Sequence, residues 1–299
     1  MTTYQHIAAN KRRTIFLMSV FVLFILAVGF VFSELLQYGP SAFVFAGVIA
    51  TGMSLVSYYS GDRIALWTSG AQPIDPKEHP YVHRIVENLC ITAGVPVPKV
   101  YIIHDSAMNA FATGRDPQHA SIAFTTGIIE HLENEELEGV AAHELSHIKN
   151  YDTRLMMIVI ICVGLVGLLA DFFLRWSFFG GHSRREDRSV PQLGAILAIV
   201  GLVLAILSPF IAKLIQLAIS RRREFLADAS GVLLTRYPEA LAKALEKIGA
   251  QDQPIRRVNS ATAHLYIANP FGSMRSFTHL FSTHPPIKLR IQALRGMAS

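Results

Sequence analysis

The stretch that decides the fold is VAAHELSHIKNYD, residues 140–152, and within it His143-Glu144-Leu145-Ser146-His147. Histidines four positions apart project from the same side of a helical turn, so both imidazoles can reach one ion. Glu144 directly follows the first histidine, which places its carboxylate where it can act on a water molecule without being a ligand. Short matches of this kind also occur on exposed helices of unrelated proteins, so the motif alone does not establish a zinc site.

The residues before the motif favour a helix. Asn134 is a suitable N-cap, and Glu135 and Glu136 complement the positive end of a helix dipole in its first turn. Apolar and small residues follow at 137–142. We therefore expect the motif to lie on a helix capped by Asn134.

The composition indicates a membrane protein. The chain has 299 residues, a mean hydropathy of +0.36 and only 16% charged residues, whereas soluble domains carry about 25%. The net charge of +5 is modest and requires no nucleic-acid partner. The two cysteines, Cys90 and Cys162, indicate neither a disulfide framework nor a cysteine-based zinc site. For Cys90 a buried structural role is favoured over a thiol nucleophile.

Two apolar runs predict an N-terminal membrane anchor over residues 1–60. Residues 14–32 and 41–59 are each long enough to cross a hydrocarbon core of about 30 Å as a helix. The first run follows a basic cluster at 11–13 and is not followed by a small-residue cleavage site, which indicates an uncleaved anchor. The basic cluster places the N-terminus in the cytoplasm, so the chain returns there after the second run.

Two further apolar runs, 155–174 and 193–219, make up the segment 155–219. If both cross the membrane, the arginine-rich loop 175–191 lies outside, where positive charge is disfavoured. The alternative is a hairpin that dips into the membrane or packs on the soluble part of the protein. The sequence thus predicts up to four transmembrane helices.

The remaining sequence predicts an α+β, mostly helical fold in two parts, 61–154 and 220–299. The first part would carry the motif helix, and the second would carry a further ligand. Periodic apolar residues and turn residues predict helices over 79–93, 127–132 and 238–248, a helix from Glu224, strands over 100–103 and 120–125, and a last helix after His284-Pro285-Pro286.

A catalytic zinc takes about three protein ligands and keeps one position open. A third histidine six residues after His147 is absent, since Thr153 stands there. Glu224 is the best candidate for the third ligand because it lies on a predicted helix and on the same side of the membrane as the motif. Asp228 follows one turn later on the same face, where it can accept the other ring N–H of a ligand histidine. The alternative for Glu224 is a salt bridge with a neighbouring arginine.

These elements, in this order, resemble the HtpX-type membrane zinc metallopeptidases, relatives of the CAAX prenyl endoprotease. The resemblance spans nearly the whole chain. It rests on the apolar runs and on Asn109-Ala110-Phe111-Ala112-Thr113-Gly114, His143-Glu144-Leu145-Ser146-His147, Arg223-Glu224-Phe225-Leu226-Ala227-Asp228 and Thr283-His284-Pro285-Pro286.

The resemblance implies a gluzincin-like zinc protease core with one Zn²⁺ per chain, held by His143, His147 and Glu224. It implies that Glu144 is the catalytic acid and base and that His284 faces the active site. It also implies a multi-pass enzyme of a bacterial or archaeal plasma membrane. The active site would face the cytoplasm, and the enzyme would degrade misfolded or damaged membrane proteins.

By the same resemblance, Asn109, Ala110, Phe111 and Ala112 would form a strand edge that pairs with the substrate backbone. Turn chemistry for Asn109 and a core position for Phe111 are the alternatives. The expected partners are polypeptides, unfolded or membrane-embedded, and the lipid bilayer, with no nucleic acid. The sequence leaves the oligomeric state open.

The expected reaction is zinc-assisted peptide hydrolysis. Zinc lowers the pKa of a bound water toward ~7, and Glu144 would take the water's proton and deliver it to the leaving amine. His284, with Arg290 as a second candidate, would stabilise the oxyanion. The alternative function is a non-catalytic zinc-binding membrane scaffold or sensor, which would not need Glu144. A transporter is disfavoured because, of Asp, Glu, Lys, Arg and His, the apolar runs hold only Asp171 and Lys213.

Overall fold

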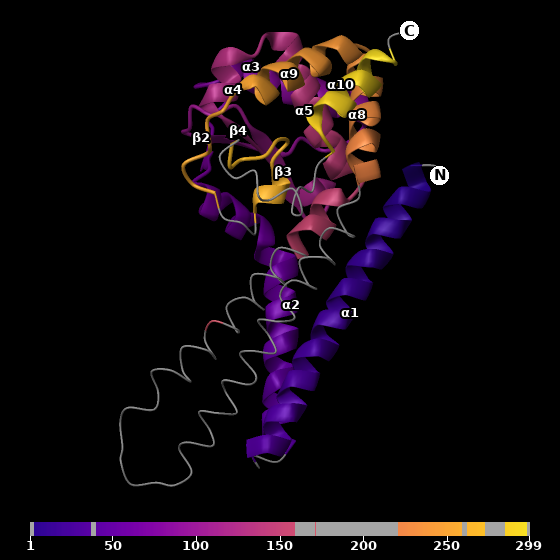
Figure 1. Cartoon of the computed structure of the whole chain (residues 1–299), viewed down its shortest axis with the longest axis vertical. Coiled ribbons are helices and arrows are strands. Elements are labelled where there is room, and N and C mark those ends of the chain that lie inside the picture. The colour runs from indigo at the N-terminus through magenta and orange to yellow at the C-terminus, as the bar shows by residue number, and fades with distance from the viewer. Residues whose placement is uncertain are drawn as a thin grey trace.

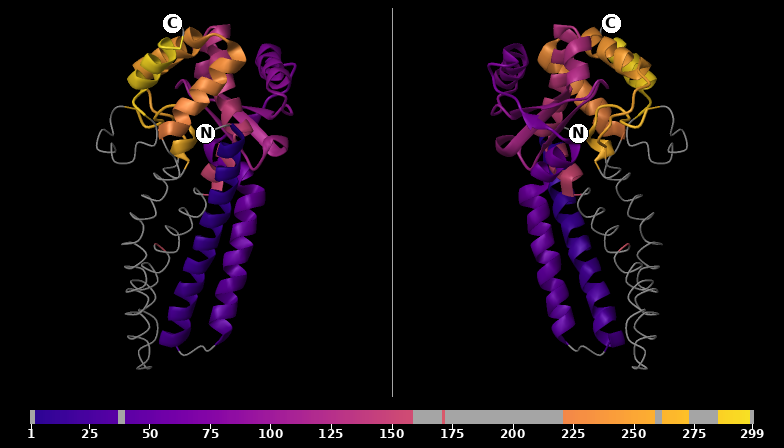
Figure 2. Two further views of the ribbon diagram at one scale, coloured as in Figure 1. Left: turned by 90° about the vertical axis from the view of Figure 1, so that its right-hand side faces the viewer. Right: turned by 90° about the vertical axis from the view of Figure 1, so that its left-hand side faces the viewer.

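Two long helices carry, at one end, a head that combines helices with a small β-sheet (Figure 1). The computed structural model describes residues 3–36, 40–158, 171, 221–258, 262–272 and 285–297. Helices α1 (Thr3–Leu36) and α2 (Pro40–Ser69) run side by side, and the N-terminal end of α1 reaches the head (Figure 2). The described part is mostly helical with one small sheet, which confirms the α+β class.

Within these ranges, no helix combines the length and the apolar character that crossing a membrane requires. The predicted crossings at 14–32 and 41–59 therefore stay predictions. Those at 155–174 and 193–219 lie outside the described residues, apart from 155–158 and 171.

The sheet has four strands in the order β1-β2-β4-β3. Strand β4 pairs in parallel with β2 and antiparallel with β3, and β1 pairs antiparallel with β2. Every residue of β4 is buried, as expected for a central strand with both faces covered. Strand β3 is an edge strand, because it stands last in the order and pairs with β4 alone. The strands are β1 (Gln72–Pro73), β2 (Lys99–Ile103), β3 (Ala110–Gly114) and β4 (Ala120–Thr125).

Short-range sequence signals delimit the helices that follow β1 and β4. Helix α3 (Pro80–Ala93) has proline in its first turn and ends at Gly94, whose φ of 66° suits glycine. Helix α4 (Thr126–His131) is capped by the Thr125 hydroxyl, which accepts from the Ile128 N–H.

Helix α5 (Asn134–Lys149) carries the His-Glu-x-x-His motif. The predicted cap was wrong by one position, because Glu133 is the N-cap and Asn134 already belongs to the helix. The Glu136 carboxylate accepts a hydrogen bond from the Glu133 N–H at 3.0 Å, so the acidic first turn satisfies the cap backbone.

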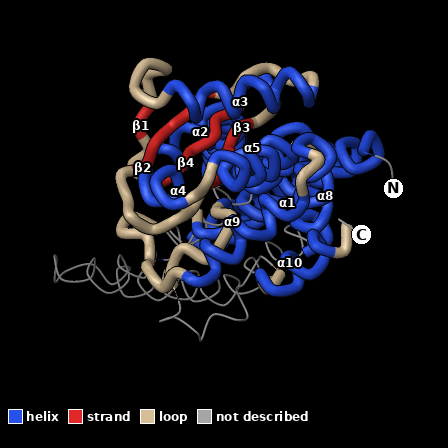
Figure 3. The backbone as a smooth tube through the Cα atoms, turned by 90° about the horizontal axis from the view of Figure 1, so that it is seen from above, coloured by secondary structure: helices blue, strands red, loops and turns tan. Residues whose placement is uncertain are grey.

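Helix α5 lies at the centre of the head. The strands lie to one side of it, and α8, α9 and α10 lie to the other (Figure 3). These helices span Arg221–Thr235, Pro238–Ala250 and Ile287–Arg295. A second, smaller core cluster joins the end of α2 to the sheet and includes Leu66, Phe111 and Tyr266. The larger core cluster surrounds α5 and combines residues of both predicted parts of the head, such as Leu145 and Leu245.

Candidate metal centre

Helices α5 and α8 bring three candidate ligands together in the buried centre of the head. His143 and His147 lie one turn apart on α5, and Glu224 lies in the first turn of α8. The two Nε2 atoms are 3.2 Å apart. The Glu224 carboxylate lies 3.8 Å from His143 Nε2 and 3.6 Å from His147 Nε2. One ligand atom from each residue lies within 4.8 Å of the other two, and all three residues are buried.

This arrangement fits a zinc ion. Tetrahedral ligand atoms about 2.0–2.1 Å from zinc stand roughly 3.3–3.4 Å from one another. The distances between the candidate ligand atoms, 3.2 to 3.8 Å, span this value. The charges agree with the geometry. Among the described residues the centre holds four buried acids, Glu144, Asp152, Glu224 and Asp228, against two buried arginines. A divalent cation would offset the surplus of negative charge.

Each histidine is oriented by its own carboxylate. Asp228 Oδ1 lies 2.9 Å from His143 Nδ1, and Asp152 Oδ2 lies 3.1 Å from His147 Nδ1. A carboxylate on Nδ1 leaves Nε2 to face an ion. The sequence predicted this contact for Asp228. It missed Asp152, although this residue ends the stretch quoted at the outset, because Asp152 lies beyond the end of α5 and helical spacing does not apply to it.

Arg290, on α10, closes the other side of the centre. It is completely buried, and it donates to both oxygens of Asp228 at 2.9 and 2.6 Å and to the Ile267 carbonyl at 3.2 Å. Its guanidinium also lies 3.7 Å from Glu224. Burial by itself would raise the pKa of Asp228, but the charge and hydrogen bonds of Arg290 lower it to about 2. The predicted role of Arg290 as an oxyanion donor thus competes with these contacts.

The two histidines differ in basicity. Burial, with the charge of Arg290, lowers the pKa of His143 to about 4. Burial also acts to lower the pKa of His147, but the hydrogen bond that its ring donates to Asp152 and the charge of Glu224 raise this pKa to about 9. The part of the metal centre around His147, Glu224 and Asp152 therefore attracts positive charge more strongly than the part around His143 and Arg290.

Glu144 is buried beside the ligand set. Burial, the largest contribution, raises the pKa of its carboxyl group to about 7, although the charge of His147 opposes this. The carboxylate accepts a hydrogen bond from the backbone N–H of Ala112. Glu144 thus connects the ligand helix to the edge strand β3.

The edge of β3 is partly occupied by the chain itself. The Thr125 N–H donates to the Asn109 carbonyl, so hydrogen-bonded pairs with β4 fall on odd-numbered positions. The even positions therefore turn their N–H and C=O groups to the open edge. There Ile267 N–H donates to the Ala110 carbonyl at 3.0 Å, and the Thr153 hydroxyl donates to the Gly114 carbonyl.

Asn109 and Phe111 both hold the segment at 266–268. The Asn109 amide donates to the Ala268 carbonyl at 3.1 Å and accepts from its N–H at 3.4 Å. Phe111 is buried against the ring of Tyr266, with centroids 5.1 Å apart. Of the four predicted substrate residues, Asn109, Ala110 and Phe111 are thus engaged within the head, and Ala112 lies next to Glu144. His284 lies outside the described residues.

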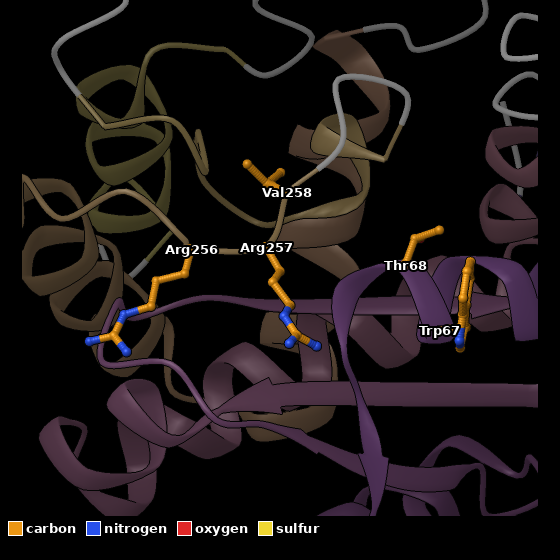
Figure 4. A pocket seen from close by; sticks show the side chains of 5 residues that line it. All are labelled: Trp67, Thr68, Arg256, Arg257 and Val258. Carbon is orange, nitrogen blue, oxygen red and sulfur yellow. The ribbon is translucent and has the colours of Figure 1, made fainter. Parts of the chain in front are cut away.

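A solvent-open hollow of about 380 Å³ lies apart from this centre (Figure 4). Trp67 and Thr68 from the end of α2 line one side, and Arg256, Arg257 and Val258 line the other. None of the candidate site residues lines it.

A buried set of two histidines and a glutamate, with an acid beside the first histidine on the same helix, defines the class as a metalloprotease. The profile of peptidase family M48 matches residues 76–298. A protein named "Protease HtpX homolog" from Caldanaerobacter subterraneus subsp. tengcongensis is 45% identical over 297 residues, which is 99% of this chain and 98% of that protein. One of the same name from Tropheryma whipplei is 45% identical over 296 residues and 99% of both chains. The chain belongs to peptidase family M48 and is of the HtpX type.

A crystal structure of S. mikatae Ste24p is also similar, at 18% identity and a TM-score of 0.49. The match covers 97% of this chain and 67% of that one.

Proposed function

We propose that the chain is a membrane-bound zinc metalloendopeptidase that hydrolyses misfolded or damaged proteins, including membrane proteins, at the cytoplasmic face of a prokaryotic plasma membrane. The position of Glu144 carries this proposal. Its carboxylate stands between the ligand histidines of α5 and the Ala112 N–H of the edge strand. A zinc-binding scaffold or sensor would need the three ligands but no acid at this position.

The residues divide the chemistry between them. Bound zinc, held by His143, His147 and Glu224, would supply Lewis acidity toward a water molecule and the scissile carbonyl. Glu144 would take the proton of the attacking water and deliver it to the leaving amine. Burial holds the Glu144 carboxylate in one orientation, which lowers the entropy cost of bringing it to the water's proton.

Substrate would pair with the part of the β3 edge that remains available. The Ala112 carbonyl faces this edge, beside Glu144, and an extended peptide can add there by backbone hydrogen bonds. Because Asn109 and Ala110 already bond the segment at 266–268, pairing at those two residues would require that segment to move. His284, by resemblance, would complete the site by donating to the oxyanion.

Exposed apolar side chains on α1 and α2 support the membrane contact. Phe45 is 68% exposed and Phe16 is 66% exposed, and exposed apolar surface on this scale is typical of lipid or protein contact. Other exposed apolar residues of the two helices are Ile15, Leu23, Phe30, Val44, Val48, Leu55 and Val56. The basic cluster at 11–13 supports a cytoplasmic location for the head.

Substitution Glu144→Gln tests the reaction. It removes the proton acceptor and preserves the shape of the side chain, so cleavage of an unfolded protein such as casein should fall by about 10²–10⁴-fold. Zinc per chain, measured by atomic absorption, should be unchanged. Glu135→Gln, in the exposed first turn of the same helix, is the matched control. Undiminished cleavage would contradict the mechanism, and a zinc-loaded wild type without any cleavage would favour the scaffold.

A further inference from the structure

The first turns of α1 dock beside the metal centre. Asn10 lies four residues before the beginning of the predicted 14–32 run, and its side chain is buried. Its amide donates to the Asn150 carbonyl at 2.9 Å and to Asp152 Oδ1 at 2.8 Å. Its oxygen accepts from Arg223 Nη2 at 3.4 Å. Both N–H groups and the oxygen of this one amide are therefore used within the head.

The turn that Asn10 contacts is strained. Tyr151 has a φ of 60°, the left-handed region that non-glycine residues rarely adopt. Such a conformation persists only where its surroundings hold it. Asn10 bonds the residues on both sides of Tyr151, and Lys11 Nζ lies 4.4 Å from the centre of the Tyr151 ring. Helix α1 thus holds the turn that follows the ligand helix.

This turn places the Asp152 carboxylate beside the candidate ligand His147. Asp152 Oδ1 accepts a hydrogen bond from Asn10 and lies 3.0 Å from Arg223 Nε in an ion pair, while Oδ2 lies 3.1 Å from His147 Nδ1. Arg223 directly precedes Glu224 on α8. The network therefore connects α1, the turn after α5 and the beginning of α8. Within this network the Asn10 amide has all its polar atoms satisfied, which favours a single geometry for it.

We propose that Asn10 is a positioning residue of the metal centre, and that α1 contributes through it to zinc affinity. The path runs from the Asn10 amide through Asp152 to the outer nitrogen of His147. The inference rests on the proposed zinc site and adds to it a requirement for the N-terminal helix. Asparagine suits this position because it supplies two donors and one acceptor on a short stem.

Thr14 provides a matched control on the same helix. It is one turn further along α1 and is also buried, but its hydroxyl has no hydrogen-bond partner within the described residues. Thr14→Val therefore alters a buried polar group of α1 without touching the network.

The test measures zinc dissociation constants by competition with a chelator of known affinity, for the full chain and its variants in detergent. Asn10→Ala, which suits a helix, should weaken zinc binding on the order of 10-fold, since the outer partners of metal ligands typically contribute that much or more. Asn10→Asp should weaken it further, because a second carboxylate would face Asp152. Thr14→Val should stay within about twofold of the wild type, since it leaves these partners in place.

The melting temperatures of the zinc-free proteins separate positioning from folding. Melting of zinc-free Asn10→Ala close to that of Thr14→Val, with weaker zinc binding, supports the inference. Zinc affinities equal to wild type in both Asn10 variants overturn it while leaving the proposed function intact. If Asn10→Ala does not fold, the nearly isosteric Asn10→Asp decides by the same two measurements. A wild type that binds no zinc, or binds it equally well after His143→Ala, overturns the proposed function and this inference with it.

Discussion

Asp228 links the candidate ligand His143 to the buried guanidinium of Arg290. It accepts from His143 on one side and from Arg290 on the other, and all three side chains are almost fully buried. Buried charges are tolerated when they are paired, and removing one partner exposes the cost of burying the other. Without the Asp228 carboxylate, Arg290 would keep the more distant Glu224, 3.7 Å away, and the charge of Glu144.

Substitution Asp228→Asn should therefore lower both stability and zinc affinity. We expect the free energy of unfolding to fall by about 3–5 kcal/mol and the zinc dissociation constant to rise about 10–100-fold. Urea unfolding of the zinc-free chain and chelator competition measure the two effects. Glu239→Gln breaks an exposed pair with Arg295 and should cost little stability, because water screens that pair. Equal losses in the two variants would contradict the role given to Asp228.

At the scale of the element, α8 presents one stripe to α5. Glu224, Asp228 and Gly231 recur at spacings of four and three, so they lie on the same face of the helix. A Cβ at Gly231 would stand 3.1 Å from the His143 nitrogen and 3.2 Å from the Ala142 carbonyl carbon. Both neighbours are backbone atoms of the ligand helix. The absence of a side chain at Gly231 thus sets how closely the two ligand-bearing helices approach.

Gly231→Val should push α8 away from α5. We expect a loss of about 1–3 kcal/mol from overpacking, together with weaker zinc binding because Glu224 shifts relative to the histidines. Leu233→Val is the control, since it introduces the same β-branched residue at a site that is 77% exposed. Thermal unfolding and zinc competition compare the two. Zinc affinity unchanged in Gly231→Val would show that the helix spacing does not govern the site.

At the scale of the whole molecule, two helices with exposed apolar faces support a head whose centre is polar and buried (Figure 1). The proposed function assigns those faces to lipid. If this is correct, a tryptophan at position 45 lies among acyl chains, and bromine on those chains quenches its fluorescence only at close range.

This is tested with Phe45→Trp in a chain whose own Trp67 and Trp176 are replaced by phenylalanine. After reconstitution, brominated lipids should quench most of its emission. Ile91→Trp, at a residue of the head that is 74% exposed, should be quenched little. Equal quenching at positions 45 and 91 would contradict the proposed arrangement.

Features that depend on short spacing could be predicted from the sequence. Local periodicity predicted the helix that carries His143 and His147 and the strands at 100–103 and 120–125. It also predicted that Glu224 and Asp228 lie on the same helical face. The cap at Asn134 was wrong by one residue, because Ser, Thr, Asp and Asn are preferred caps and the capping role of Glu133 went unrecognised.

The substrate edge shows where local reasoning stops. The Asn109 amide bonds Ala268, 159 residues away, and the Ala110 carbonyl bonds Ile267. No spacing rule reaches across such a separation. The position of these residues at an edge was predictable by resemblance, but what covers the edge was not.

The sequence by itself determined the two candidate ligands His143 and His147 and the helix that bears them, because 3.6 residues per turn sets which side chains within one helix can face one ion. The tertiary structure alone decided what surrounds those ligands. Asn10, Asp152 and Arg290 meet the ligands only when α1, the turn after α5 and α10 pack together. The reason is burial: once charged groups leave water, each must find its partner wherever the fold provides one.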